Sequence, residues 1–229
     1  RGDIESLIVG SPQRLGMEFS DRYRPFLSHS FKVGKSDFSS QHLTKTWEQM
    51  IIEFGFLEEV TFEPFMLKNL EEKKKNQLRI GIALGSSNNP SKQWPINCWI
   101  EFIRLVNDHF RECVFHIFGM NSDIENSTLI VEECKNVEII NYCGKTTLTE
   151  LAEQFTHCEA LIGCDSGAVH LASAVGVPTL TIFGPTNKTV TCPCFDTKRI
   201  EYLSHSRSTT LNCSPSDVLL SFIQLIKIC

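Results

Sequence analysis

The sequence predicts an α/β fold, in which helices cover both faces of a parallel β-sheet. From Leu78 onward, short apolar runs alternate with stretches of helical periodicity. Two of these runs lead directly into polar segments that contain hydroxyl side chains, at residues 86–92 and 165–167. Alternation of this kind implies right-handed crossovers and a sheet that is buried on both sides.

We expect five strands and five helices in this region. Apolar runs of buried type predict the strands, at residues 79–84, 114–118, 137–141, 159–164 and 178–183. Helical spacing of apolar residues predicts the helices, near residues 97–110, 122–134, 147–157, 167–175 and 215–228.

The first 70 residues are less regular. They contain one helix-like stretch, at residues 42–56, and little other periodicity. The charged run at residues 71–77 is most simply a solvated connection between a first half with little periodicity and a second half with regular alternation of strands and helices. We therefore place a domain boundary there, with a partial domain and linker at residues 1–77 and a larger domain at residues 78–229.

Composition and charge exclude several classes of function. No apolar run approaches the length of a membrane span, and the net charge of −5 argues against nucleic acid as the main partner. The ten cysteines are widely and irregularly spaced, unlike a disulfide framework. The N-terminus has no signal-peptide pattern, so we expect a cytoplasmic protein.

The turn at residues 165–167 is a candidate anion site. Asp165, Ser166 and Gly167 stand between an apolar strand and a helix of small residues, where backbone N–H groups and the positive end of the helix dipole favour an anion such as phosphate. His170 lies one turn further, on the face shared with Ser166 and Gly167. The alternative is simple helix capping by Asp165 or Ser166 with a surface histidine.

A second polar loop follows the strand at 79–84. It contains Ser86, Ser87 and Lys92, and it precedes the next helix. The carboxyl ends of strands in an open parallel sheet line a common crevice, so this loop and the turn at 165–167 are expected to face one ligand.

Other chemistries fit less well. The first strand of the larger domain is not followed by Gly-x-Gly-x-x-Gly, and Gly144-Lys145-Thr146 lacks the earlier glycine of a Walker loop, because residue 139 is isoleucine. Cys192-Pro193-Cys194 has no second ligand pair at zinc-site spacing, so no metal site is expected. Cys164 has no identifiable base, and buried packing is the better interpretation.

At these positions the chain resembles glycosyltransferase family 9, the bacterial lipopolysaccharide heptosyltransferases. The resemblance rests on Lys-x-Trp-Pro at 92–95, the segment Gly144–Ala152, Asp-Ser-Gly-x-x-His at 165–170 and Phe-Gly-Pro-Thr at 183–186, taken in order. It implies a GT-B-type glycosyltransferase, with a complete C-terminal Rossmann-like, nucleotide-sugar-binding donor domain and a partial N-terminal acceptor domain.

The resemblance also implies the reaction. A heptose would pass from an ADP-activated sugar donor to a lipopolysaccharide core or lipid A-linked acceptor, with inversion and without a metal or other cofactor. Lys92, Ser86 and Ser87 match the family's phosphate loop, while Ser166 and Gly167 would add backbone N–H groups. Contact with the cytoplasmic face of the inner membrane would be peripheral at most.

Two carboxylates are assigned from the same resemblance. Asp165 would hold sugar hydroxyls. Asp123 falls near the position of the family's acidic ribose contact, although a carboxylate at a helix N-terminus is an equal alternative.

The catalytic base is where the chain departs from the family. Family members begin with a strand that leads into a Gly-Asp dipeptide, whose aspartate is taken as the base. No strand precedes Gly2-Asp3, so the base is expected upstream of Arg1 rather than at Asp3. The alternatives are a nucleotide-sugar-binding fragment or degenerate relative without transfer activity, or another two-domain nucleotide-sugar enzyme such as an epimerase.

Overall fold

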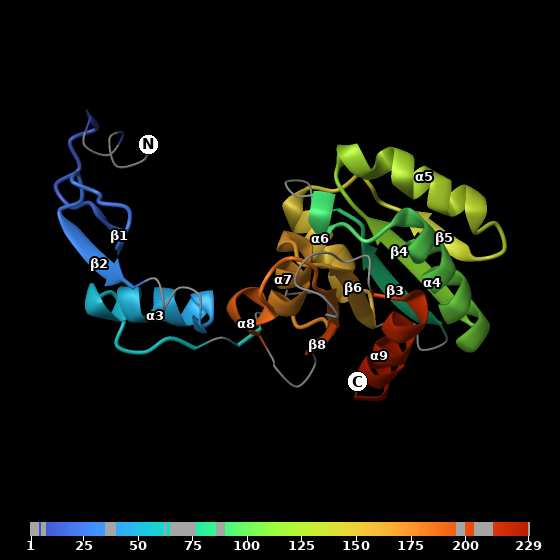
Figure 1. The fold of residues 1–229 in the computed structure, drawn as a ribbon. Coiled ribbons are helices and arrows are strands. Elements are labelled where there is room, and N and C mark those ends of the chain that lie inside the picture. Colours follow the sequence, from blue (N-terminus) through green and yellow to red (C-terminus); the bar gives the residue numbers. More distant parts are fainter. Residues whose placement is uncertain are drawn as a thin grey trace. The chain divides into compact units, whose positions relative to one another are not determined.

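The fold is described from a computed structural model. It covers residues 5, 8–34, 40–61, 63–64, 77–85, 90–195, 200–203 and 213–228. The chain forms two compact units, one of residues 1–61 with 189–191 and one of residues 62–188 with 192–229 (Figure 1). The boundary expected near residue 77 stays a prediction, because residues 65–76 lie outside the described part. Asp3, Ser86 and Ser87 lie outside it as well.

The smaller unit contains two strands that the sequence did not predict. Strands β1 (Leu15–Phe19) and β2 (His29–Val33) pair in parallel. Helix α3 (Leu43–Glu53) follows, within the predicted range of 42–56, and the His42 side chain caps it by accepting a hydrogen bond from the Thr44 N–H. All five residues of β1 are half-buried, so this strand lacks the alternation that marks a strand in sequence.

The larger unit is built on a six-stranded sheet in the order β5-β4-β3-β6-β7-β8, and every adjacent pair is parallel. Five strands confirm the prediction, and β8 was not predicted. The strands are β3 (Leu78–Ala83), β4 (Cys113–Phe118), β5 (Glu138–Asn141), β6 (Ala160–Cys164), β7 (Thr179–Ile182) and β8 (Ile200–Leu203).

Five helices of this unit were predicted, with starts and ends within about two residues of those observed. They are α4 (Ile96–His109), α5 (Ile124–Glu133), α6 (Leu148–Thr156), α7 (Gly167–Ala174) and α9 (Pro215–Ile228). Short elements escaped prediction because a single turn has no measurable period: η1 (Pro90–Lys92), η2 (Asn121–Asp123) and α8 (Lys188–Thr191).

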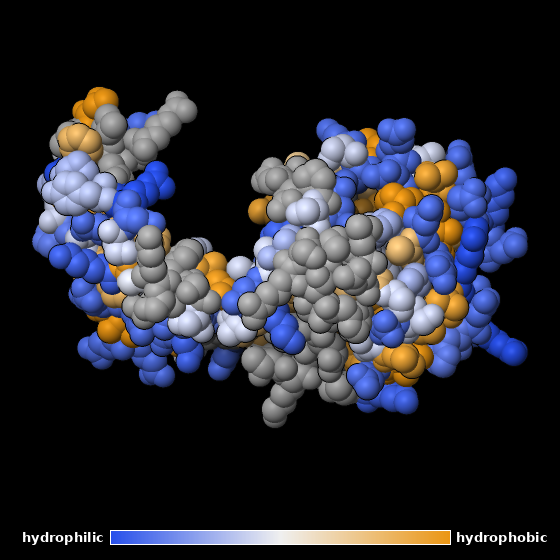
Figure 2. Space-filling model, in the orientation of Figure 1, coloured by the Kyte–Doolittle hydropathy of each residue, from blue (hydrophilic) through white to orange (hydrophobic). Residues whose placement is uncertain are grey.

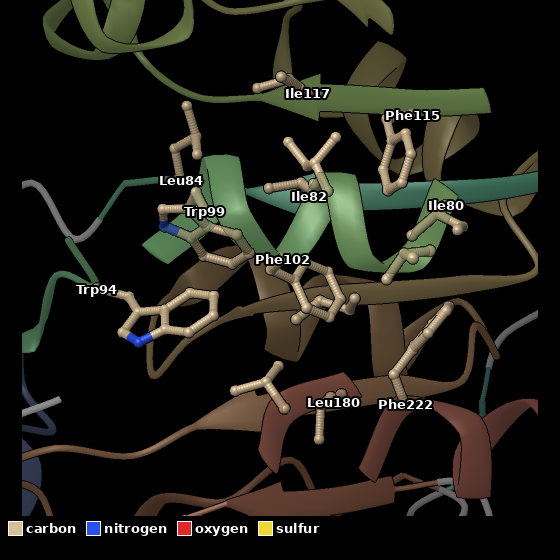
Figure 3. Close-up of a cluster of buried hydrophobic side chains, with 14 of the residues drawn as sticks. Ile80, Ile82, Leu84, Trp94, Trp99, Phe102, Phe115, Ile117, Leu180 and Phe222 are labelled. Carbon is tan, nitrogen blue, oxygen red and sulfur yellow. The ribbon is translucent and has the colours of Figure 1, made fainter. Parts of the chain in front are cut away.

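The sheet is buried on both faces, as its apolar strands predicted. On one face, α4, α5 and α9 pack over side chains that include Ile80, Ile82 and Phe115 (Figure 3). On the other face, α6 and α7 pack over a second cluster that includes Phe118 and Leu161. The α/β fold class is therefore confirmed, with helices on both sides of the sheet.

Strand β6 and helix α7 are in close contact because Gly163 has no side chain. A Cβ atom at Gly163 would lie 2.9 Å from Cγ1 of Val169 in α7 and 3.0 Å from Cβ of Ala83 in β3. This glycine lets the first turn of α7 lie directly against the strands.

The surface in view carries mostly polar side chains, with apolar ones scattered among them (Figure 2). None of the helices in the described ranges has the length and apolar character to cross a bilayer.

Candidate functional site

A pocket of about 960 Å³ opens at the carboxyl ends of β3, β4 and β6, within the larger unit. Its lining includes Gly85 after β3, Gly119 after β4, and Asp165 and Ser166 after β6. Lys92 reaches it from η1. Strand ends in a parallel sheet converge at one edge, which is why segments 80 residues apart in the chain meet here.

Lys92 and Asp165, each assigned to a different loop, are in direct contact. The Lys92 Nζ donates to Asp165 Oδ2 at 2.9 Å and lies 3.5 Å from the Asp165 carbonyl oxygen. His170 Nε2 lies 3.8 Å from the other carboxylate oxygen, Oδ1. The structure thus brings together one carboxylate and two basic side chains, at the start of α7.

The Asp165 carboxylate is 5% exposed and is held as an anion. Burial by itself would raise its pKa, but the hydrogen-bonding groups of His170 and Lys92 outweigh burial and lower the pKa to about 2. Lys92 and His170 remain more accessible, with side chains 22% and 42% exposed. Lys92 and Asp165 both line the pocket, so the Lys92 ammonium is available to a ligand there, whereas His170 is not among the described residues that line it.

The helix-capping alternative is wrong for Ser166. Ser166 occupies the N-cap position of α7 in an extended conformation, yet its side chain makes no capping hydrogen bond. The Ser166 Oγ is buried and has no hydrogen-bond partner in the structure. Asp165 instead engages Lys92 and His170. A buried hydroxyl without a partner is costly, and a ligand oxygen at this point would satisfy it.

Gly167 leaves open space at the first position of α7. A Cβ atom added there would meet nothing within 4 Å, and Gly167 lines the pocket. The start of the helix is therefore accessible to a ligand at the place where the helix dipole favours an anion.

The surroundings of Asp123 agree in part with both roles suggested by the sequence, a carboxylate at a helix N-terminus and a contact to ribose. It is 4% exposed, and its Oδ2 accepts a hydrogen bond from the Met120 N–H at 2.8 Å, which stabilises the turn η2 before α5. It also lines the pocket between Gly85 and Gly119, where any added Cβ would lie within 3 Å of Asp123. A role as a ribose contact stays a prediction.

The sequence analysis assigned no site role to the apolar rim of the pocket. Met120 and Leu148 both line the pocket, although 61% and 73% of their surfaces are exposed. Leu148 begins α6, which is capped by reciprocal hydrogen bonds between Thr147 and Glu150. The sequence did contain a signal for Leu148: it follows the predicted strand β5, and the segments after the carboxyl ends of all strands in a parallel sheet lie at one edge.

Cys164 is a packing residue, as predicted. It is fully buried, and burial raises the pKa of its thiol to about 12, so it carries no reactive thiolate at neutral pH. Across the described ranges, no group of three or more His, Cys, Asp or Glu residues is arranged to hold a metal ion.

Together, the sheet order and the pocket define a Rossmann-like domain with a pocket at the carboxyl edge of its sheet, the edge at which open α/β sheets bind their ligands. The family follows from comparison. The chain belongs to glycosyltransferase family 9 (heptosyltransferase), whose family model matches residues 10–216.

Solved structures with the same fold include a glycosyl transferase family 9 protein from Veillonella parvula, with a TM-score of 0.79 and 19% identity over 99% of this chain and 71% of that one. Another is the E. coli ADP-heptose LPS heptosyltransferase II, with a TM-score of 0.75 and 19% identity over 98% of this chain and 73% of that one. The GT-B prediction is thereby confirmed.

Curated relatives match the chain over shorter segments. Lipooligosaccharide heptosyltransferase 2 of Campylobacter jejuni (strain 81116) is 26% identical over 132 residues, 57% of this chain and 42% of the relative. Lipopolysaccharide heptosyltransferase 2 of E. coli K12 is 28% identical over 125 residues, 53% of this chain and 35% of the relative. These matches span less than half the length of the relatives.

Proposed function

We propose that the larger unit binds the diphosphate of an ADP-activated sugar in the pocket at the carboxyl edge of its sheet. The observation that carries this proposal is the arrangement around the start of α7: the Lys92 ammonium, 2.9 Å from Asp165, and the buried Ser166 hydroxyl, which has no partner among the described residues. A diphosphate would give the Ser166 hydroxyl an acceptor oxygen and would add further acceptors for the Lys92 ammonium and the first N–H groups of α7.

The nucleotide base would rest on the apolar rim. Met120 and Leu148 present exposed apolar surface beside the pocket, and burying such surface under a planar ring is favourable. Adenine is the base we propose, because the related E. coli heptosyltransferases were solved as an ADP-heptose enzyme and as a complex with ADP. Asp123, on the floor between the strand ends, would face the ribose.

The reaction we propose is inverting transfer of a heptose to a lipopolysaccharide core acceptor on the cytoplasmic side of the inner membrane. The departing ADP carries negative charge, which Lys92 and the start of α7 would stabilise without a metal. Asp165 is a poor candidate for the base, since a carboxyl with a pKa of about 2 has little affinity for a proton. Transfer therefore requires a base other than Asp165.

Calorimetry tests the donor site. Titration of the chain with ADP, UDP and GDP should show binding of ADP in preference to the other two, with an affinity that EDTA does not change. Equal binding of all three nucleotides, or loss of binding in EDTA, would contradict the proposed donor or its independence from metal.

A transfer assay separates the two functions that remain open. The chain is incubated with ADP-heptose and a heptose-deficient core acceptor, and the product is identified by mass spectrometry. Transfer shows an enzyme that already contains its base, whereas tight ADP binding without transfer shows a nucleotide-sugar-binding unit. The second result is favoured by the low pKa of Asp165.

A further inference from the structure

Trp94 connects the Lys92 loop to two distant parts of the larger unit. Its ring is 2% exposed, and its Nε1–H donates to the carbonyl oxygen of Cys213 at 2.8 Å. Trp94 also belongs to the same buried cluster as Cys164, the residue directly before Asp165, and its backbone N–H acts to lower the pKa of the Cys164 thiol, against the larger effect of burial. Trp94 therefore bonds to the chain just before α9 and lies in the cluster that includes the end of β6.

The Cys213 carbonyl, which accepts the hydrogen bond from Trp94, lies in a well-packed part of the core. Cys213 is 1% exposed, and in α9 Val218 and Phe222 are fully buried against the sheet. The Phe222 ring lies 6.1 Å from Phe102, which in turn lies 6.1 Å from Trp94 (Figure 3). A carbonyl fixed in this way is a rigid acceptor for the Trp94 indole.

Lys92 is two residues from this fixed point. The lysine side chain is long and rotatable, and ordering it costs conformational entropy. Its backbone is confined on one side by η1 and on the other by Trp94 and by Pro95, where α4 begins. Its ammonium lies 2.9 Å from Asp165, at the end of the same strand that Trp94 contacts.

We propose that Trp94 is a positioning residue for Lys92, and that the hydrogen bond from its indole to Cys213 makes the C-terminal helix α9 part of the nucleotide site. This inference rests on the proposed function. No residue of α9 lines the pocket, so an effect of α9 on nucleotide binding has to be indirect, and the hydrogen bond between Trp94 and Cys213 is a direct connection from the chain just before α9 to the Lys92 loop.

The neighbouring Trp99 provides a matched control. It is fully buried and lies edge to face with Trp94 at 4.8 Å between ring centroids, but its own Nε1 has no hydrogen-bond partner in the structure. Trp94→Phe and Trp99→Phe thus remove the same ring atoms from the same cluster, and only the first removes a hydrogen bond.

The test compares ADP affinity by calorimetry in wild type and in the two variants. Trp94→Phe should weaken ADP binding about fivefold relative to Trp99→Phe, the equivalent of one neutral hydrogen bond. In a Lys92→Ala background the Trp94→Phe effect should fall below about twofold, because the two residues act as one unit. A merely structural tryptophan would give the same loss in both backgrounds.

Hydrogen exchange on the unmodified chain decides the question if Trp94→Phe does not fold. ADP should then slow amide exchange at residues 213–218 in wild type, and this protection should be absent in Lys92→Ala. Equal ADP affinity of the two phenylalanine variants, or no protection at 213–218, overturns the role of Trp94 while the donor site stands. Failure of wild type to bind ADP overturns the proposed function, and this inference with it.

Discussion

At the scale of residues, the site depends on one buried carboxylate and the two basic side chains beside it. Asp165 is almost inaccessible, whereas Lys92 lines the pocket and His170 lies 3.8 Å from the carboxylate. An unpaired charge in this position would be strongly destabilising, so each partner has a structural role, and our proposal adds a binding role for Lys92. This dual role sets what single substitutions are expected to do.

Lys92→Ala should weaken ADP binding by about 1.5 to 3 kcal/mol, the range for a hydrogen bond to a charged group. Calorimetry measures the change. Lys135→Ala is the control, because Lys135 is exposed and precedes β5, at the opposite edge of the sheet from the pocket. Equal ADP affinity in wild type and Lys92→Ala would show that the diphosphate binds elsewhere.

Asp165 should make the protein sensitive to acid. Its folded pKa of about 2 lies below the ordinary value of 3.8, so the unfolded chain binds the proton first as the pH falls. The contribution, roughly 2 kcal/mol, is complete above about pH 4 and is lost toward pH 2. Urea unfolding at a series of pH values should therefore show a shallower decline between pH 4 and 2 in Asp165→Asn than in wild type. Parallel curves would contradict the ion-pair assignment.

At the scale of elements, the contact of β6 with α7 decides how close a ligand can approach the sheet. Gly163 permits this contact from the strand, and Gly167 leaves the start of the helix open. The two glycines lie four residues apart in one strand and helix unit, but they differ in what a side chain would meet.

Replacing each glycine by alanine should separate folding from binding. Gly163→Ala should destabilise the fold by about 1 to 3 kcal/mol, since its methyl group would overlap Val169 and Ala83. Gly167→Ala should leave stability unchanged or slightly raised, because alanine favours helix. It should nevertheless weaken ADP binding, because its methyl group would occupy ligand space. Thermal unfolding and calorimetry give the two readouts, and unchanged ADP affinity in Gly167→Ala would place the diphosphate away from α7.

Strand β4 carries a second source of pH dependence. His116 is 6% exposed, and burial, with smaller contributions from Arg79 and His157, lowers its pKa to about 4. Because the unfolded histidine protonates near pH 6.5, stability should fall by roughly 3 kcal/mol between about pH 6.5 and 4. His116→Leu should remove this part of the decline in denaturant unfolding curves. If His116→Leu loses as much stability as wild type between pH 6.5 and 4, His116 is not the source of this pH dependence.

At the scale of the whole molecule, the pocket belongs to one unit. All of the described residues that line the pocket lie between Ala83 and Leu171, within the larger unit. Ligand binding to the folded state stabilises only the unit that forms the site.

ADP should therefore act on the two units differently. At a hundred times its Kd, ADP should raise the free energy of unfolding of the larger unit by about 2.7 kcal/mol. Amide exchange in β6 and α7 should slow accordingly, while exchange in α3 of the smaller unit should not change. Equal protection of α3 would show that the smaller unit also contributes to the ADP site.

The sequence was sufficient for the architecture of the larger unit. Five strands and five helices were predicted at nearly their observed positions, because apolar runs and helical spacing are local properties of the chain. It also pointed to Lys92 and Asp165, since polar residues after buried strands meet at one edge of a parallel sheet. The family motifs agreed, and the match over residues 10–216 confirmed the family.

Only the tertiary structure showed which side chains contact one another. Two contacts join residues that are far apart in the chain: Lys92 pairs with Asp165, and Trp94 bonds to Cys213, 119 positions away. The burial of the Ser166 hydroxyl without a partner among the described residues is likewise a result of packing. No local sequence pattern contains these features. The parallel pair β1 and β2 was missed for a related reason: half-buried strands without alternation are recognised only by their pairing. Local sequence determined which segments form strands and helices, and packing determined which polar groups meet in the pocket at the carboxyl edge of the sheet.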